Sequence, residues 1–302
     1  HLQRQMTRVY LAQISTVHAF CQTILRQYAV EAELPADFRV ADEQQAAALR
    51  AQVLRDTLAE RYADLQQEPD FAAMIDTLGY GRDDRRLLAL AEESYTIMRC
   101  QVDPAAWMQS CLRAYDLPEG TQAEETVWGG YFMQERLRVL QSAQALLEQA
   151  LALCAGDEKL EAKCRTVLQK NLEDIQAQQA MQTWDACAAG KLTSFGTMRG
   201  AGDQDTLARI KALRKQAWDS VKDIQSCFYA DSARVVQDLR RTLPALRGLL
   251  SLLRDFDARF TQEKLRRHLL DFSDLEHRMI RLLTQRGSGK PTAAARSISE
   301  TY

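Results

Sequence analysis

The chain has 302 residues, of which 46% are hydrophobic and 26% charged, and its formal net charge is −2. This balance predicts about two globular domains and neither favours nor excludes a polyanionic partner. No apolar run reaches the roughly eighteen residues of a membrane span, and seven scattered cysteines contain no C-x-x-C pair. The sequence therefore excludes a membrane partner, argues against a zinc site or a disulfide framework, and favours a cytoplasmic protein.

The sequence contains only 13 glycines and 6 prolines, the residues that most often form turns and interrupt helices. This scarcity predicts a mainly α fold. The first elements are a short β-prone run over residues 9–14 and a helix over residues 20–28. Between them lies Ile14-Ser15-Thr16-Val17-His18-Ala19-Phe20-Cys21. A strand that delivers Ser, Thr and His to the mouth of a helix is a common way to present a site. The alternative is that Ser15 or Thr16 only caps the helix.

An extended connector over residues 32–40 leads to a series of helices. Asp42 is placed to cap a helix over residues 43–65, and Asp103-Pro104 is placed to open another. Two further helices are predicted between them, over residues 70–78 and 84–99.

The longest periodic segments follow a break over residues 116–130. Narrow apolar stripes run from Phe132 to Cys154 and from Glu158 to Ala188, and they resemble seams between helices. They predict a long helical hairpin that turns at Gly156. One long, locally broken helix is the alternative.

Residues 189–202 are rich in glycine but lack the order G-x-x-x-x-G-K-[ST], so they predict a connector rather than a phosphate-binding loop. Helices follow from Asp203 or Asp205 and from Asp231, the latter with a bend expected at Pro244. Ser273 and Glu276 are the predicted capping box of a helix that ends near residue 283. A last helix is predicted from residue 293.

Charge is distributed unevenly along the chain. Residues 31–135 hold 21 acids and 9 bases, a balance of −12, whereas residues 199–286 hold 12 acids and 18 bases, a balance of +6. The basic block fits a surface for nucleic acid, or the two blocks attract each other. The candidate DNA contacts in the basic block are Arg199, Lys211, Arg214 and Lys215.

No complete catalytic set is present. The four histidines include no H-x-x-x-H pair, which argues against a metal site. Asp271 and Asp274 could act as paired carboxylates, but a capping role explains both more simply. The sequence therefore predicts no catalytic residue and no bound cofactor within this chain.

Two stretches far apart in the chain fit one family. Residues 14–21 resemble the T-x-H-S-F motif of UvrD/RecB-type superfamily 1 DNA helicases, with Ala19 in place of the usual Ser. The stretch Leu270-Asp271-Phe272-Ser273-Asp274-Leu275 resembles their D-F-x-D-L motif. Residues 38–43, 71–90 and 99–107 look like the AddA subunit of the bacterial AddAB helicase–nuclease.

The resemblance implies a division into domains. Residues 1–35 and 265–302 would be flanks of a RecA-like motor domain, and residues 36–264 a helical insertion of the 1B type. The implied fold class is a mainly α multi-helix insertion subdomain with small α/β motor remnants at both termini. The chain begins at His1 and ends at Tyr302 in mid-pattern, which is expected of a fragment whose ATP- and Mg²⁺-binding Walker segments lie outside it.

The resemblance also assigns site residues. Thr16 and His18 match residues that touch the translocating strand. A Thr hydroxyl or an imidazole can donate to phosphate oxygens, and His can also stack on a base. Phe20, Asp271, Phe272, Asp274 and Leu275 would be structural, with both aspartates organising the return helix.

The implied parent is a 3′→5′ DNA helicase–exonuclease subunit of double-strand-break repair. Its implied partners are single-stranded DNA, the duplex near the fork, and an AddB-like subunit. This fragment is expected to contact DNA rather than to catalyse. The rival interpretation is a helical scaffolding domain, with the hairpin as its protein-binding surface and no nucleic-acid function.

Overall fold

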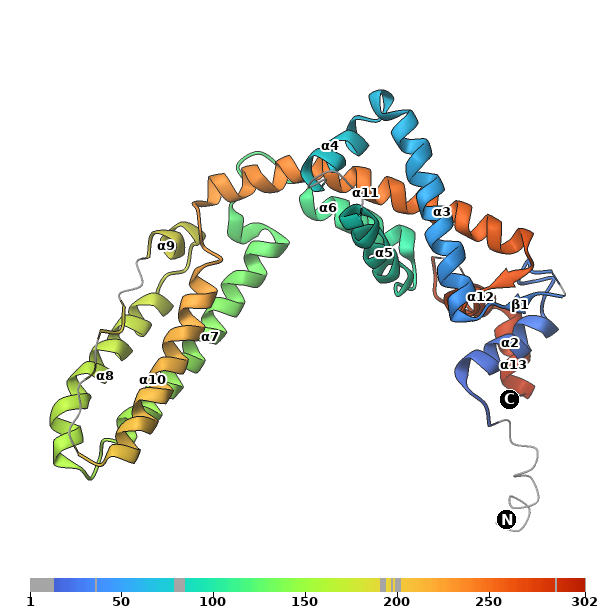
Figure 1. Cartoon of the computed structure of the whole chain (residues 1–302). Coiled ribbons are helices and arrows are strands. Elements are labelled where there is room, and N and C mark those ends of the chain that lie inside the picture. Colours follow the sequence, from blue (N-terminus) through green and yellow to red (C-terminus); the bar gives the residue numbers. More distant parts are fainter. Residues whose placement is uncertain are drawn as a thin grey trace, which may run out of the picture. The chain divides into compact units, whose positions relative to one another are not determined.

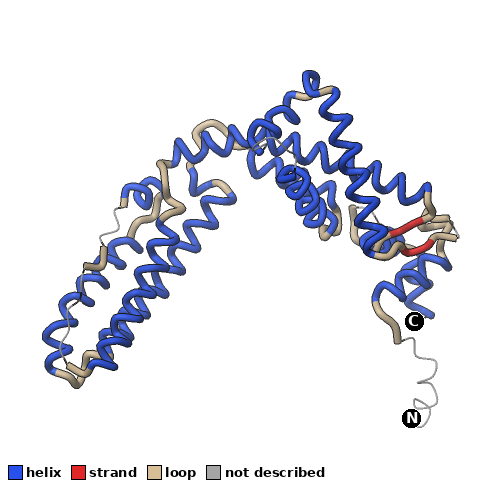
Figure 2. Tube along the Cα trace, in the orientation of Figure 1, coloured by secondary structure: helices blue, strands red, loops and turns tan. Residues whose placement is uncertain are grey.

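The computed structural model describes residues 14–35, 37–78, 85–190, 194–196, 198, 202–285 and 287–301. Within these ranges helices dominate, and the two named strands form one small sheet (Figures 1 and 2). No helix in the described ranges combines the length and the apolar character that crossing a membrane requires. The predicted strand over residues 9–14 falls almost wholly outside the described residues; Ile14 lies exposed just before the first helix.

The chain divides into two compact units. Unit 1 comprises His1–Leu112 and Pro244–Tyr302, and unit 2 comprises Arg113–Leu243. Helix α11, which spans Ser232–Arg266, contributes its first part to unit 2 and the rest to unit 1.

The predicted fold class, a single insertion subdomain with small remnants at both termini, is wrong for the chain as a whole. The terminal segments share unit 1 with the helices of residues 43–112, so they belong to a substantial body rather than to remnants. The predicted domain boundaries, after residues 35 and 264, come from the architecture of the family that the chain resembles. The division into two compact units does not test them.

Unit 1 is built from helices of both chain ends and one parallel strand pair. Its elements are α2 (Val17–Gln27), β1 (Arg39–Val40), α3 (Glu43–Ala63), the 3₁₀ helix η2 (Leu65–Gln67), α4 (Pro69–Leu78), α5 (Arg85–Arg99), most of α6 (Pro104–Tyr115), the second part of α11, β2 (Leu269–Leu270), α12 (Phe272–Leu283) and α13 (Ala293–Thr301).

Local side-chain caps start the helices of unit 1 close to where the sequence predicts. Asp42 Oδ1 accepts the N–H of Gln45 at 2.7 Å, and Asp103 Oδ1 accepts the N–H of Ala106 at 3.0 Å. Each bond satisfies one of the amides that a helix start leaves without an intrahelical partner.

Two apolar clusters hold unit 1 together. The first joins α3, α4 and α5 to α11, with Phe71, Phe256 and Phe260 fully buried. The second joins α2 to α12 and α13 beneath the strand pair, and Ile24, Leu25 and Leu275 lie within it. The two strands run parallel, with Arg39 paired in register with Leu269 and Val40 with Leu270. This pairing ties the segment after α2 to the segment before α12.

Unit 2 is a helical bundle. Its elements are η3 (Ala123–Glu125), α7 (Val127–Ala152), α8 (Glu158–Gln179), α9 (Trp184–Ala189), α10 (Gln204–Gln225) and the first part of α11. A turn that contains Gly156, at φ +100°, joins α7 to α8. Both α8 and α10 pack against α7, so the apolar stripes of three helices share one core (Figure 1). The helix predicted from Asp203 or Asp205 is present as α10, but its packing against the hairpin was not predicted.

Helix α7 begins five residues earlier than predicted. Thr126 caps it by accepting the N–H of Gly129 at 2.9 Å. A Cβ added at Gly129 would lie 1.7 Å from the carbonyl oxygen of Ala123, so η3 can approach the helix only because this residue is glycine. Gly129 and Gly130, at the end of the predicted break, therefore lie inside a helix, whereas Gly120 lies in a turn at φ +82°.

Candidate functional site

The two end motifs lie together in unit 1, where α2 packs against α12 (Figure 1). Thr16 is the N-cap of α2, and its Oγ1 accepts the N–H of Ala19 at 3.3 Å. Thr16 is exposed. A hydroxyl that accepts one bond still carries a proton that it can donate. The N-terminus of α2 therefore presents a hydroxyl and the positive end of a helix dipole to solvent.

His18, one residue into α2, contacts two residues of α12. Its Nε2 lies 3.1 Å from Oε1 of Glu276. Its ring centroid lies 4.6 Å from that of Phe272, with the two planes tilted by 32°. Phe272 and Glu276 are four positions apart, so they lie on one face of α12. Phe272 is 49% exposed.

The start of α12 is fixed by a capping box different from the predicted one. Asp271 Oδ1 accepts the N–H of Asp274 at 2.8 Å, and Asp274 Oδ2 accepts the N–H of Asp271 at 3.1 Å. Ser273 instead accepts a bond from Arg99 Nε at 3.0 Å. Both aspartates organise the helix, so they do not form an open pair of catalytic carboxylates.

The remaining motif residues pack beneath this surface. Leu275 is buried in the cluster that joins α2 to α12, and Phe20 packs against the same cluster with part of its ring accessible. These apolar contacts hold the first turns of α2 and α12 next to each other.

A buried ion cluster lies behind α12. Lys264 is 1% exposed, and its Nζ lies 2.7 Å from Asp271 Oδ2 and 2.6 Å from Asp274 Oδ2. Arg99 NH2 lies 3.1 Å from Asp274 Oδ1. Burial by itself would raise the pKa of Asp271, but the Lys264 ammonium, the Asp274 amide and Arg99 together outweigh it, and the pKa lies below its ordinary value. The cluster joins the ends of α5 and α11 to the start of α12.

His277, also on α12, lines a cleft of about 750 Å³. Its Nε2 lies 2.9 Å from the carbonyl oxygen of Arg99. Burial lowers the pKa of His277, so its ring is neutral at pH 7. The cleft is lined by Arg99, Asp257 and Arg281 among others. Because both arginines and aspartates line it, it presents no single sign of charge to a ligand.

The predicted basic residues of α10 line a shallow groove of about 270 Å³ in unit 2. Lys211 and Lys215 are exposed, and Lys215 Nζ pairs with Asp219 at 2.5 Å. The aromatic wall consists of Phe195 and Trp218, whose centroids are 5.1 Å apart. Aromatic rings beside lysines are typical of surfaces that bind single strands.

Arg214 also touches this groove but is buried. Its Nε donates to Asn171 Oδ1 at 2.8 Å, its NH2 donates to the carbonyl oxygen of Gly196 at 2.9 Å, and its guanidinium lies 5.4 Å from the Phe195 ring. Burial lowers the pKa of the Arg214 guanidinium. Its donors serve the interior of unit 2, and its predicted DNA contact stays a prediction. Arg199 lies outside the described residues.

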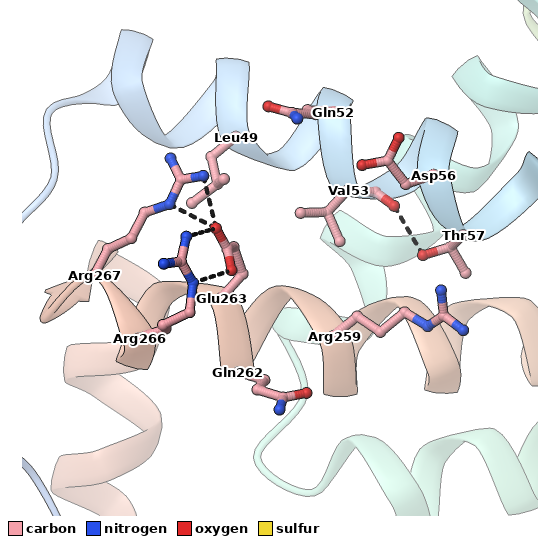
Figure 3. Close-up of a pocket in the computed structure, with 10 residues that line it drawn as sticks. All are labelled: Leu49, Gln52, Val53, Asp56, Thr57, Arg259, Gln262, Glu263, Arg266 and Arg267. Carbon is pink, nitrogen blue, oxygen red and sulfur yellow. Dashed lines mark hydrogen bonds and ion pairs between the residues drawn. The ribbon is translucent and has the colours of Figure 1, made fainter.

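A groove of about 430 Å³ between α3 and α11 was not predicted. Figure 3 shows Arg266 and Arg267 both hydrogen-bonded to Glu263, with Leu49 of α3 on the opposite side of the groove. Hydrogen bonds from these two arginines lower the pKa of Glu263 to about 2. Arg259 on the same wall pairs with Glu60. The arginines are thus largely neutralised within the protein.

The described residues include no cluster of three His, Cys, Asp or Glu side chains suited to hold a metal ion. The order G-x-x-x-x-G-K-[ST] does not occur in the sequence.

The contacts of Arg99 and Lys264 with the start of α12 were not predicted, and Glu276 was predicted as a cap rather than as the partner of His18. One signal was present for Lys264. Phe256, Phe260 and Lys264 recur every four residues, which puts the lysine on the buried stripe of α11. Arg99 and Glu276 carry no comparable local signal.

Comparison with known proteins gives a match along the whole chain. The family model of the UvrD/REP helicase N-terminal domain matches residues 2–302. The chain is 30% identical over its full length to the A subunit of the ATP-dependent helicase/nuclease of Pelotomaculum thermopropionicum, covering 24% of that protein. It is 29% identical over its full length to the protein of that name from Desulforamulus reducens, and 30% identical over 98% of its length to that from Geobacillus thermodenitrificans, covering 25% of each.

The chain therefore spans about a quarter of the length of the curated relatives it matches. Because the match to an N-terminal domain runs through residues 2–302, it also overturns the prediction that the chain is only an inserted subdomain.

Proposed function

Because this chain belongs to the UvrD/REP helicase N-terminal domain family, we propose that it contributes DNA contact rather than catalysis within an AddA-type helicase–nuclease. The observation that carries this proposal is the junction of α2 and α12. Two motifs separated by most of the chain meet there through His18, Phe272 and Glu276. A contact surface assembled from both ends of the chain explains why both motifs are present.

The N-terminus of α2 has groups that can bind the phosphates of a DNA strand. Thr16 can donate its hydroxyl proton to a phosphate oxygen, and the helix dipole attracts the same anion. In unit 2, the groove on α10 adds Lys211 and Lys215 beside Trp218. Contacts of this kind depend little on base sequence and weaken steeply with salt.

The activity of the longer protein follows as a further part of the proposal. In that protein, ATP hydrolysis with Mg²⁺ would drive 3′→5′ translocation along DNA during double-strand-break repair and recombination, with an AddB-like partner subunit. Within this proposal, the residues of this chain take no part in a hydrolytic step. Their part is to hold the strand while the motor acts.

Fluorescence anisotropy with a labelled oligo(dT) strand in about 20 mM salt tests the DNA contact. Thr16→Asp keeps an effective helix cap but places a negative charge where the phosphate would lie, so we expect binding to weaken about ten-fold. Thr16→Ser keeps both the cap and the hydroxyl, and it should bind as the wild type does. Failure of the wild-type chain to bind at this salt concentration would remove the proposal.

A further inference from the structure

We propose that an exposed aromatic surface at the start of α7 is a docking site for an arginine-bearing segment of a partner protein. This α7 aromatic surface consists of Val127, Trp128 and Tyr131 on α7, together with Tyr115 at the end of α6. It lies within unit 2 and shares no residue with the junction of α2 and α12. Its role is therefore independent of the proposed DNA contact.

The side chains of the α7 aromatic surface leave apolar area open to solvent. Val127 is 64% exposed, Trp128 41% and Tyr131 62%. Residues three and four apart lie on the same side of a helix, so Tyr131 is adjacent to both of the others. Tyr115 extends the surface, because its ring centroid lies 5.7 Å from that of Trp128. Exposed patches that contain tryptophan and tyrosine are typical of protein–protein interfaces, where these residues supply much of the binding energy.

The elements that carry the surface are fixed by contacts within unit 2. The 3₁₀ helix η3 packs closely against Gly129 of α7. Arg240 of α11 donates to the carbonyl oxygens of Leu117 and Pro118, which holds the segment that follows Tyr115. A surface that is already ordered loses little conformational entropy when a partner binds.

The charge around the surface is negative. Residues 116–135 contain no lysine or arginine and five acids, which are Asp116, Glu119, Glu124, Glu125 and Glu135. Three of them, Asp116, Glu119 and Glu125, are exposed. The C-terminus of α6, which is the negative end of its dipole, also lies beside Trp128. These charges repel a polyanion and attract a cationic segment.

Glu135 shows how this face of α7 binds a guanidinium. It follows Tyr131 by four residues and Trp128 by seven, so it lies on the same side of the helix. Arg138 donates to its two carboxylate oxygens at 2.9 and 2.5 Å. Because a carboxylate accepts about four hydrogen bonds, Glu135 has acceptor capacity left for a second guanidinium.

Rings beside carboxylates favour arginine over lysine in the partner. The planar guanidinium stacks on an aromatic face and at the same time donates paired hydrogen bonds to a carboxylate, whereas an ammonium does only part of this. Val127 and the ring edges leave room for apolar contacts beside the charge. The occupant is therefore a segment in which arginines stand next to apolar side chains.

Fluorescence anisotropy of the full chain with a short labelled peptide, in which arginine alternates with leucine, tests the proposal. A second peptide carries citrulline in place of arginine, which keeps the shape of the side chain and removes its charge. Trp128→Leu and Tyr131→Ala remove the rings, and Glu135→Gln removes one negative charge. Val102→Ala, at a position 73% exposed in unit 1, is the control. Circular dichroism verifies the fold of each variant.

We expect the wild type to bind the arginine peptide at least about ten-fold more tightly than the citrulline peptide. Each ring variant should bind the arginine peptide about five-fold more weakly, and Glu135→Gln about three-fold more weakly. Val102→Ala should bind as the wild type does. Equal affinity for the two peptides, ring variants with wild-type affinity, or no binding of the arginine peptide at about 100 μM protein would each overturn the proposal.

Two other occupants of the surface give results of their own. If Trp128→Leu weakens the binding of oligo(dT) as much as that of the arginine peptide, the surface binds nucleic acid and the proposal is wrong. If the wild type forms dimers in analytical ultracentrifugation and Trp128→Leu does not, a second copy of the chain covers the surface and the proposal is again wrong.

Discussion

Replacing Lys264 with methionine is predicted to destabilise unit 1 by about 3–5 kcal/mol at neutral pH. The ammonium of Lys264 is 1% exposed and contacts Asp271 at 2.7 Å and Asp274 at 2.6 Å. Methionine keeps most of the packing but leaves Asp271 as a partly buried carboxylate without its cation. Asp274 retains Arg99 at 3.1 Å, so we expect the lower end of this range.

The pH dependence of this effect has a definite sign. In the wild type the pKa of Asp271 is lowered, so its stabilising contribution is present above the unfolded pKa of about 3.9 and is lost as pH falls through the folded pKa. In Lys264→Met, burial without the cation raises the pKa of Asp271, and acid relieves the penalty of a buried charge. The difference between the two proteins should therefore be largest near pH 7 and shrink toward pH 4.

Amide hydrogen exchange in α11 and α12, followed by mass spectrometry, measures the loss in opening free energy. A loss of about 3 kcal/mol accelerates exchange roughly a hundred-fold. Lys215→Met removes an exposed lysine that also pairs with an aspartate, and it should give no measurable change. An effect of Lys264→Met below about 1 kcal/mol, or one that grows as pH falls, would refute the reasoning.

Three further predictions follow from local geometry. Gly129→Ala should destabilise unit 2 by several kcal/mol in urea unfolding, because its Cβ would meet the carbonyl oxygen of Ala123 at 1.7 Å, whereas Gly130→Ala should be neutral or stabilising by up to about 1 kcal/mol. Asp42→Ala should cost about 1 kcal/mol by uncapping α3, again measured by urea unfolding. The carboxyl carbon of Glu263 should titrate in ¹³C NMR with a midpoint of about 2.

For each of these three predictions, one outcome would contradict the reasoning. Equal stability of the two glycine variants would contradict the close approach of η3 to α7. Asp42→Ala with wild-type stability would contradict the cap. A Glu263 midpoint near 4.5, its ordinary value, would contradict the double arginine contact.

Helix starts were predictable from the sequence where the determining bond is local. Asp42, Asp103 and Asp203 each accept an amide three residues ahead, and the pattern of residues alone reveals this. The start of α12 shows the limit of this reasoning. Ser273 and Glu276 fit a capping box as well as Asp271 and Asp274 do, but Ser273 is occupied by Arg99 from a distant helix.

The candidate site was predictable in part. Family resemblance identified Thr16 and His18, but the contacts of His18 with Phe272 and Glu276 depend on the packing of α2 against α12, which no local pattern encodes. Arg214 shows what the charge pattern alone leaves out. Its position in a basic block suggests a surface, whereas its guanidinium is buried against Asn171 of another helix. Charge along the sequence does not specify which side of a helix faces the core.

Hydrogen–deuterium exchange of the chain with and without oligo(dT) tests the central claim most directly. The claim is that the first turns of α2 and α12 form one DNA-contacting surface. We predict that peptides covering residues 16–27 and 271–283 are both protected when the strand is added, and that strong salt removes the protection of both. Protection of one segment without the other, or of neither while the strand is bound, would contradict the account.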